Sequence, residues 1–214
     1  MWYGRFWGAP VGEPVHVPTV AVVLCAGAGG RFAGQGLGPK LLQPLGGRPL
    51  VRWALEHAAS AGLDATVAVT GAVDLADVAP PGVVLLANPA WPEGIATSLA
   101  VAVGWARRLG FGSVVVGLGD QPLIGPGAWR QVASASGELA VATYGGRRRN
   151  PVKLARSVWD ELPVSGDEGA RTLMRRRPEL VREVPCHGDP VDVDRLEDLL
   201  LVRQVLGSGT ALER

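Results

Sequence analysis

Short apolar runs alternate along the chain with longer segments in which apolar residues recur every three or four positions. The short runs, rich in Val and Leu, predict strands at 20–26, 65–70, 83–87, 113–118, 139–143 and 180–185. The longer segments predict helices at 49–61, 93–109, 124–135, 154–162, 170–176 and 195–205. Because parallel strands need a crossover connection, this alternation favours a mostly parallel sheet with helices on both faces. The expected fold class is therefore α/β with three layers.

A single domain over 19–206 accounts for this pattern. The chain has 214 residues, and its hydrophobic content of 47% is enough for one core of that size. An aromatic-rich extension at 1–18, with Trp2, Tyr3, Phe6 and Trp7, precedes the first strand, and a short tail at 207–214 follows the last helix.

Composition narrows the partners and the compartment. The formal net charge is +1 and 19% of the residues are charged, so no global field favours nucleic acid or an anionic membrane. No apolar run approaches the ~20 residues of a membrane span, and 1–19 lacks the apolar core of a signal peptide. We expect a cytoplasmic monomer. Cys25 and Cys186 are far apart in sequence and are interpreted as packing residues.

The first predicted strand ends in a glycine-rich loop. Glycines directly after a buried strand allow a sharp turn and a close approach of the backbone to a ligand, although such a turn also forms without one. Backbone N–H groups, Arg31 and Lys40 would suit the phosphates of a nucleotide. The candidate nucleotide-binding residues are Ala26, Gly27, Ala28, Gly29, Gly30, Arg31 and Lys40.

Two common phosphate motifs do not fit this loop. A dinucleotide-binding fingerprint needs glycine three residues after Gly29, where Phe32 stands. A P-loop needs Gly-Lys-Ser/Thr, whereas Lys40 lies between Pro39 and Leu41.

Carboxylates follow two other predicted strands. Asp120 comes directly after the very apolar run 113–118, where it could bind a metal or accept backbone N–H bonds in a turn. Asp192 and Asp194 alternate in an extended segment and so share one face. Asp194 is also suited to cap the last helix, with Glu197 completing a capping box. We therefore interpret Asp120 and Asp192 as the metal pair and Asp194 as structural.

A series of motifs over about 19–206 resembles the molybdenum cofactor cytidylyltransferases. They occur in that family's order: Leu24-Cys-Ala26-Gly27, Asn88-Pro-Ala-Trp91-Pro-Glu-Gly94 with Ser98, Leu118-Gly-Asp120-Gln121-Pro122, Asn150-Pro151, Gly166-Asp167-Glu-Gly169-Ala170-Arg171 and Asp192-Val-Asp194. The Asn-Pro-x-Trp-x-x-Gly and Gly-Asp-x-Gly-Ala-Arg elements are more specific than the glycine loop. The resemblance implies a Rossmann-like nucleotidyltransferase fold.

The resemblance also implies an activity and its participants. CTP would be the donor, Mg²⁺ the cofactor and the phosphate of molybdopterin the acceptor, with a molybdoenzyme of the xanthine dehydrogenase type as a candidate recipient. Lys40, Asp120 and Arg31 would be catalytic, and Ser98 would contact the nucleotide base. Ala26 favours CTP, because guanylyl members carry glycine there. The acceptor would be bound by Asn150, Asp167, Gly169 and Arg171, and Arg147, Arg148 and Arg149 could line its pocket.

The sequence differs from the family's pattern at two places, and three other functions stay open. The loop between Arg31 and Lys40 is longer than is usual for the family, and Arg149 stands where glycine is usual. The alternatives are guanylyl or uridylyl transfer to another phosphorylated small molecule, NAD(P)H-dependent reduction of a quinone-like compound, and non-catalytic delivery of the cofactor. Pyrophosphate release against NAD(P)H oxidation distinguishes the transferase from the reductase.

Overall fold

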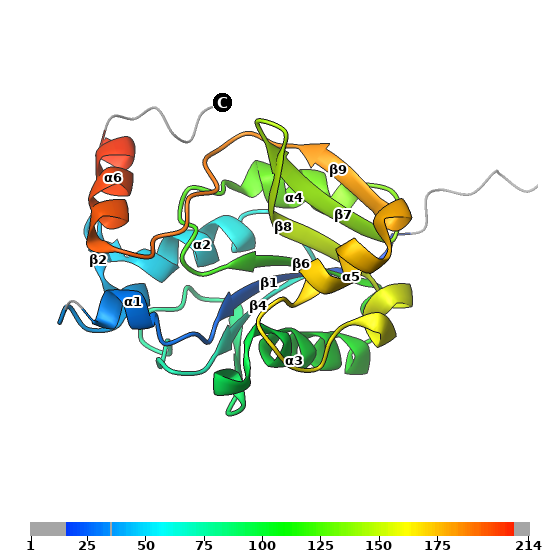
Figure 1. Cartoon of the computed structure of the whole chain (residues 1–214), viewed down its shortest axis with the longest axis horizontal. Coiled ribbons are helices and arrows are strands. Elements are labelled where there is room, and N and C mark those ends of the chain that lie inside the picture. Colours follow the sequence, from blue (N-terminus) through cyan, green and yellow to red (C-terminus); the bar gives the residue numbers. More distant parts are fainter. Residues whose placement is uncertain (1–15, 35, 208–214) are drawn as a thin grey trace, which may run out of the picture.

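The computed structural model describes residues 16–34 and 36–207, which form one α/β unit (Figure 1). Most of the expected aromatic extension, 1–15, and the tail at 208–214 lie outside the described residues. The strands are β1 (Thr19–Cys25), β2 (Pro44–Leu45), β3 (Arg48–Pro49), β4 (Ala65–Thr70), β5 (Val83–Ala87), β6 (Ser113–Leu118), β7 (Leu139–Tyr144), β8 (Arg147–Ala155) and β9 (Val181–Pro185). The α-helices are α1 (Gly30–Ala33), α2 (Leu50–Ala59), α3 (Ile95–Arg108), α4 (Pro126–Ser134), α5 (Ala170–Arg176) and α6 (Leu196–Gly207).

Seven strands form the central sheet in the order β5-β4-β1-β6-β8-β7-β9. Neighbouring strands are parallel except where β8 pairs with β6 and with β7. This sheet confirms the expected three-layer, mostly parallel α/β architecture. The strands β1, β4 and β6 therefore end at the same edge, where ligands bind in folds of this kind.

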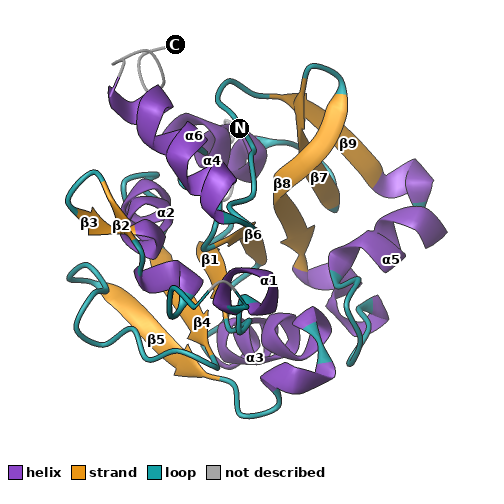
Figure 2. Ribbon diagram, turned by 60° about the vertical axis from the view of Figure 1, so that its left-hand side comes forward, coloured by secondary structure: helices purple, strands orange, loops and turns teal. Residues whose placement is uncertain are grey.

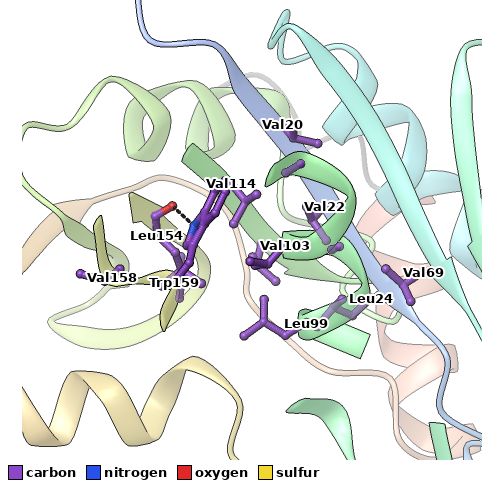
Figure 3. Close-up of a cluster of buried hydrophobic side chains, with 14 of the residues drawn as sticks. Val20, Val22, Leu24, Val69, Leu99, Val103, Val114, Leu154, Val158 and Trp159 are labelled. Carbon is purple, nitrogen blue, oxygen red and sulfur yellow. Dashed lines mark hydrogen bonds between the residues drawn. The ribbon is translucent and has the colours of Figure 1, made fainter. Parts of the chain in front are cut away.

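Alternating residues of β1 bury both faces of the sheet. Val20, Val22 and Leu24 belong to a core cluster with α3, α5 and the 3₁₀ helix η3 (Arg156–Glu161), part of which is drawn in Figure 3. Ala21 and Val23 belong to a second cluster with α2 and α4 on the opposite face. All seven residues of β1 are buried, as expected for a strand covered by helices on both sides.

A third cluster lies beside the sheet and fixes the last helix. Leu199 and Val202 of α6 pack with Phe32 of α1 and with Val193 of the segment that precedes α6. Figure 1 shows α6 next to α1 and β2, away from β9. The C-terminal segment thereby brings Asp192 and Asp194 to the carboxyl edge of the central strands.

The structure corrects one part of the expected element order. The arginine-rich segment is the start of strand β8, and Leu154, expected in a helix, lies within that strand. Trp159 follows in η3, where its indole N–H donates to the carbonyl of Leu154 at 3.1 Å (Figure 3). Among the described residues, no helix is long and apolar enough to cross a bilayer.

Candidate active site

A lysine and two aspartates from three distant segments meet at the carboxyl edge of the sheet. The Nζ atom of Lys40 lies 2.7 Å from Oδ2 of Asp120 and 3.2 Å from Oδ1 of Asp194. Asp120 follows β6, and Asp194 precedes α6. The backbone N–H of Val193 donates to the carbonyl of Asp120 at 3.0 Å, which fixes the two aspartate-bearing segments relative to each other.

Burial and charge oppose each other at Lys40, whose side chain is only 9% exposed. Burial alone would lower the pKa of the ammonium group, but the charges of and hydrogen bonds to Asp120 and Asp194 raise that pKa above its ordinary value. The lysine is therefore held charged. The second oxygen of Asp120, Oδ1, is buried and has no hydrogen-bond partner within the described part of the chain.

Gln121 connects Asp192 to the strand β8. Its amide nitrogen donates to Oδ1 of Asp192 at 2.8 Å, and its amide oxygen accepts from Nδ2 of Asn150 at 3.0 Å. Desolvation and the nearby charge of Asp120 raise the pKa of Asp192, against the effect of the bond from Gln121. A cation beside Asp120 and Asp192 would relieve that repulsion.

The glycine loop runs past the same lysine. Gly27, Ala28 and Gly30 are exposed, so their backbone is open to a ligand. Gly29 has a φ of +62°, and a Cβ there would lie 3.0 Å from Cβ of Lys40, so glycine suits both the turn and the close contact. Arg31 lies in α1, but its side chain is outside the described part of the structure.

A buried polar network supports the start of α3. The amide nitrogen of Asn88 donates to Oγ1 of Thr97 and to Oγ of Ser98, both at 2.9 Å. Ser98 is only 3% exposed, so its hydroxyl is held by Asn88 within the fold. Ala26, also buried, directly follows strand β1, and its carbonyl accepts from the N–H of Ala72 at 3.0 Å.

The start of α3 is also joined to the loop that leads into α5. The N–H of Gly166 donates to the carbonyl of Glu93 at 2.9 Å, and the N–H of Ala96 donates to the carbonyl of Gly166 at 3.0 Å. A Cβ on Gly94 would lie 2.4 Å from the oxygen of Gly166. The segment with Asp167 and Gly169 is therefore fixed to the segment with Ser98.

A cavity of about 670 Å³ begins at Gln121 and Asp192 and lies between the sheet, α3 and α5. Gln121, Asn150 and Asp192 line it. So do five other residues expected to bind or flank the acceptor: Arg148, Arg149, Asp167, Gly169 and Arg171. Its apolar lining comes from Leu24, Ile95, Leu99, Val116, Leu118, Val141, Val152 and Met174.

The carboxylates suit a divalent cation that is completed by a substrate. Asp120 and Asp192 offer hard oxygen ligands, and Asp120 has an unpartnered buried oxygen. Within 16–34 and 36–207 no three His, Cys, Asp or Glu side chains form a metal site by themselves. Mg²⁺ is usually bound through one or two carboxylates together with phosphates and water, and this donor set fits that pattern.

The structure thus brings together Lys40, Asp120, Asp192 and Asn150, which the sequence singled out. It adds Asp194, expected to be structural, to the contacts of Lys40. It also adds Gln121, which lies in the Leu-Gly-Asp-Gln-Pro motif and was given no role. The carboxylate that accepts from the backbone N–H groups of Asp194 and Arg195 belongs to Asp198, not to the expected Glu197.

Solved structures share this fold. Rv0371c from Mycobacterium tuberculosis H37Rv superposes with a TM-score of 0.75 and 27% identity, covering 88% of this chain and 98% of that one. A second structure of Rv0371c, in complex with manganese, has a TM-score of 0.68.

Sequence comparisons give the family. Nicotine blue oxidoreductase of Paenarthrobacter nicotinovorans is 31% identical over 199 residues, covering 85% of this chain and 94% of that protein. The bifunctional protein GlmU of Gluconacetobacter diazotrophicus is 34% identical over 158 residues, or 70% of this chain, and the match spans about a third of its length (32%). The model of the MobA-like NTP transferase domain matches residues 21–181. This match shows that the chain belongs to the MobA-like NTP transferase family.

Proposed function

We propose that this protein transfers CMP from CTP to the phosphate of molybdopterin and releases pyrophosphate. The observation that carries the proposal is the meeting of Lys40, Asp120 and Asp194 beside an open glycine loop. The neighbouring residues Gln121 and Asp192 line a cavity large enough for a second substrate. Membership of the NTP transferase family supports the reaction class. The identity of both substrates rests on the motifs of the sequence.

In the proposed reaction, an oxygen of the acceptor phosphate attacks the α-phosphorus of CTP. A new P–O bond forms, the bond from the α-phosphorus to the bridging oxygen of the β-phosphate breaks, and pyrophosphate leaves. The attacking phosphate is already ionised, so no general base is required. The residues of the chain contribute position and charge. The amides of 28–31 and the side chain of Lys40 would bind the triphosphate, with Arg31 as a second cation.

Asp120 and Asp192 would hold a divalent cation. When bound, Mg²⁺ would neutralise negative charge on the α-phosphate and on the acceptor. The manganese complex of Rv0371c supports the use of a divalent metal. Gln121 keeps the carboxylate of Asp192 oriented. The nearby charge of Asp120, which with desolvation raises the pKa of Asp192, would be offset by a bound cation.

CTP is proposed as the donor because of Ala26. Its Cβ stands at the junction of β1 and the glycine loop, where guanylyl members carry glycine. The hydrogen bonds from Asn88 to Thr97 and Ser98 would keep the start of α3, which is proposed to contact the base, rigid.

The test is a panel of donors with one acceptor. The protein is incubated with Mg²⁺, molybdopterin and each of the four NTPs in turn, and pyrophosphate is measured. The expected result is release with CTP at the highest kcat/KM and no release without molybdopterin. Equal values for CTP and GTP, or a preference for GTP, would discard CTP as the donor and leave nucleotidyl transfer in place.

A second candidate is NAD(P)H-dependent reduction of a quinone-like compound. The observation that favours it is the 31% identity to nicotine blue oxidoreductase over nearly the whole of that protein. NAD(P)H oxidation in the presence of a quinone, with no pyrophosphate from any NTP, would select this candidate over the first.

A further inference from the structure

The cavity that Gln121 and Asp192 line combines apolar side chains with four arginines. Its apolar lining comes from the sheet, α3 and α5, and Arg148, Arg149, Arg171 and Arg175 also line it. Figure 2 shows α5 next to the end of the sheet formed by β8, β7 and β9. An occupant of this cavity therefore meets aliphatic side chains on one part of its surface and guanidinium groups on another.

Two of the four arginines are already paired with carboxylates. Nε of Arg148 lies 2.8 Å from Oε1 of Glu183, and Nη1 of Arg175 lies 2.8 Å from Oε1 of Glu168. Hydrogen bonds from Arg175 and Thr172 lower the pKa of Glu168 to about 2, so this carboxylate stays ionised. The charges of Arg148 and Arg175 are thus largely compensated within the protein.

Arg149 and Arg171 differ from that pair. In the described part of the chain, the guanidinium of Arg149 donates only to the backbone carbonyl of Arg148, at 3.1 Å. Among the described residues, Arg171 forms no side-chain hydrogen bond or ion pair, although its charge acts on Glu168 and helps to lower the pKa of that carboxyl. Among the lining carboxylates, Asp192 belongs to the reaction centre, and Oδ1 of Asp167 lies close to Gly94. These two cations are therefore available to a ligand.

A bulge explains why successive residues of β8 line the same cavity. The pairing of β7 with β8 passes from Val141↔Val152 directly to Ala142↔Arg149, so Asn150 and Pro151 are additional residues on β8. In a regular strand, neighbouring side chains point to opposite faces, whereas a bulge redirects them. Both Arg149 and Asn150 consequently line the cavity.

We propose that Arg149, together with Arg171, binds an anionic group of the acceptor and selects acceptors in which that group is carried on a planar ring whose faces pack against the aliphatic lining. The inference rests on the proposed function, since it names the class of molecule that enters the acceptor cavity. It assigns a specific role to Arg149, which stands where the motif of similar sequences has glycine. Sugar phosphates are poor occupants because their saturated rings carry hydroxyl groups all round, and the aliphatic lining offers these groups no partners.

The test uses 1-naphthyl phosphate as the probe, with 1-naphthol and glucose 1-phosphate for comparison. Binding to the full chain is measured by titration calorimetry without nucleotide. Arg149→Gln removes the charge in question, and Arg147→Gln is the matched control, because Arg147 lies on the same strand, is exposed and does not line the cavity. Thermal melting checks that both variants are folded.

The expected result is tightest binding of 1-naphthyl phosphate by the wild-type protein. Arg149→Gln should weaken it at least tenfold, because a hydrogen bond to a charged group is worth about that much, and Arg147→Gln should change it less than twofold. The inference would be overturned if the wild-type protein did not bind 1-naphthyl phosphate, or if it bound 1-naphthol equally well. It would also be overturned if Arg149→Gln lost no affinity, or if both variants lost it equally. The titration contains no NTP, so a failure of CMP transfer in the donor panel would be seen separately.

Discussion

Lys40 and Asp120, 80 positions apart in sequence, form an ion pair of 2.7 Å between Nζ and Oδ2 in which the lysine side chain is 9% exposed. Removing one partner of a buried ammonium–carboxylate pair is costly, because the remaining charge is left without compensation. Under the proposed function, the same carboxylate would hold a divalent cation. Lys40 would therefore neutralise the carboxylate of Asp120 until a bound triphosphate replaces that carboxylate as the partner of the lysine.

The first prediction follows from this competition. Lys40→Met should raise the affinity of the nucleotide-free protein for Mn²⁺ by about tenfold or more, because a charge-assisted hydrogen bond no longer competes for Asp120. The measurement is titration of free Mn²⁺ by electron paramagnetic resonance.

Lys153→Met is the control for this experiment. Lys153 is a half-buried lysine whose Nζ donates to the carbonyl of Ala135, so its replacement removes the same charge elsewhere. Unchanged or weaker Mn²⁺ binding by Lys40→Met would show that the lysine does not compete with the cation.

The second prediction concerns pH and Asp192. The pKa of this carboxyl is raised above 3.8 in the fold, so its ionisation above that pH costs folding free energy. Asp192→Asn should therefore raise the melting temperature at pH 7 slightly, by about 1–2 °C. The gain should vanish below pH 3.8, where both folded and unfolded chains are protonated at this position. Turnover of the same variant should fall by ~10²-fold or more.

Asp189→Asn provides the comparison for this variant. Asp189 lies in the same segment and its Oδ1 accepts from the N–H of Val191, a bond that asparagine can also accept. A stability gain of the same size in Asp189→Asn, or a loss in Asp192→Asn at pH 7, would contradict the assigned repulsion around Asp192.

The third prediction concerns the start of α6. Oδ2 of Asp198 accepts from the backbone N–H of Asp194 at 3.0 Å and of Arg195 at 2.8 Å. Asp198→Ala should lower the free energy of unfolding by ~0.5–2 kcal/mol, as for the loss of a helix cap, while Glu197→Ala should stay within about 0.5 kcal/mol. Urea denaturation measures both, and the reverse order would restore Glu197 as the capping partner.

Glu197 and Asp198 also show how far the sequence predicts the start of α6. The capping pattern before α6 was evident, but Glu197 and Asp198 differ by one position, and the choice depends on where the helix begins. Short apolar runs predict β4, β5 and β6 with the bounds that the structure has. The bounds of α5 are also predicted, because it directly follows Gly169 and ends at a run of arginines.

The sequence does not predict strand β8, for a local reason. It singles out Asp194 as structural and does not predict its contact with Lys40, for a tertiary reason. Three arginines followed by Asn150-Pro151 show no alternation of apolar residues, and proline argues against a central strand, yet the bulge accommodates it. The contact between Lys40 and Asp194 joins residues 154 positions apart. It depends on how α6 packs against α1, which no pattern within either segment specifies.

The fourth prediction tests the link between α3 and the loop before α5. Gly94 has a φ of +108°, and a Cβ there would lie 2.4 Å from the carbonyl oxygen of Gly166. Gly94→Ala should destabilise the protein by more than the ~1–3 kcal/mol that such a positive-φ conformation costs a residue with a Cβ.

Gly110→Ala separates the two causes. Gly110 has a φ of +80° with nothing within 4 Å of its Cβ position, so this variant has backbone strain without a clash. Equal losses in urea denaturation would show that the contact with Gly166 adds nothing to stability.

Under the proposed function, Asp120 lies at a nucleotidyl-transfer centre, and the decisive measurement is pyrophosphate release from CTP with molybdopterin and saturating Mg²⁺. The wild-type protein should turn over, and Asp120→Asn should be slower by at least ~10²- to 10³-fold while remaining folded, because a charge-stabilising contact of the transition state is lost. Asp160→Asn, at an exposed partner of Arg107, should match the wild type. Near-normal release by Asp120→Asn would remove Asp120 from the reaction, and absence of release by wild type with every NTP, together with NAD(P)H oxidation, would contradict the account.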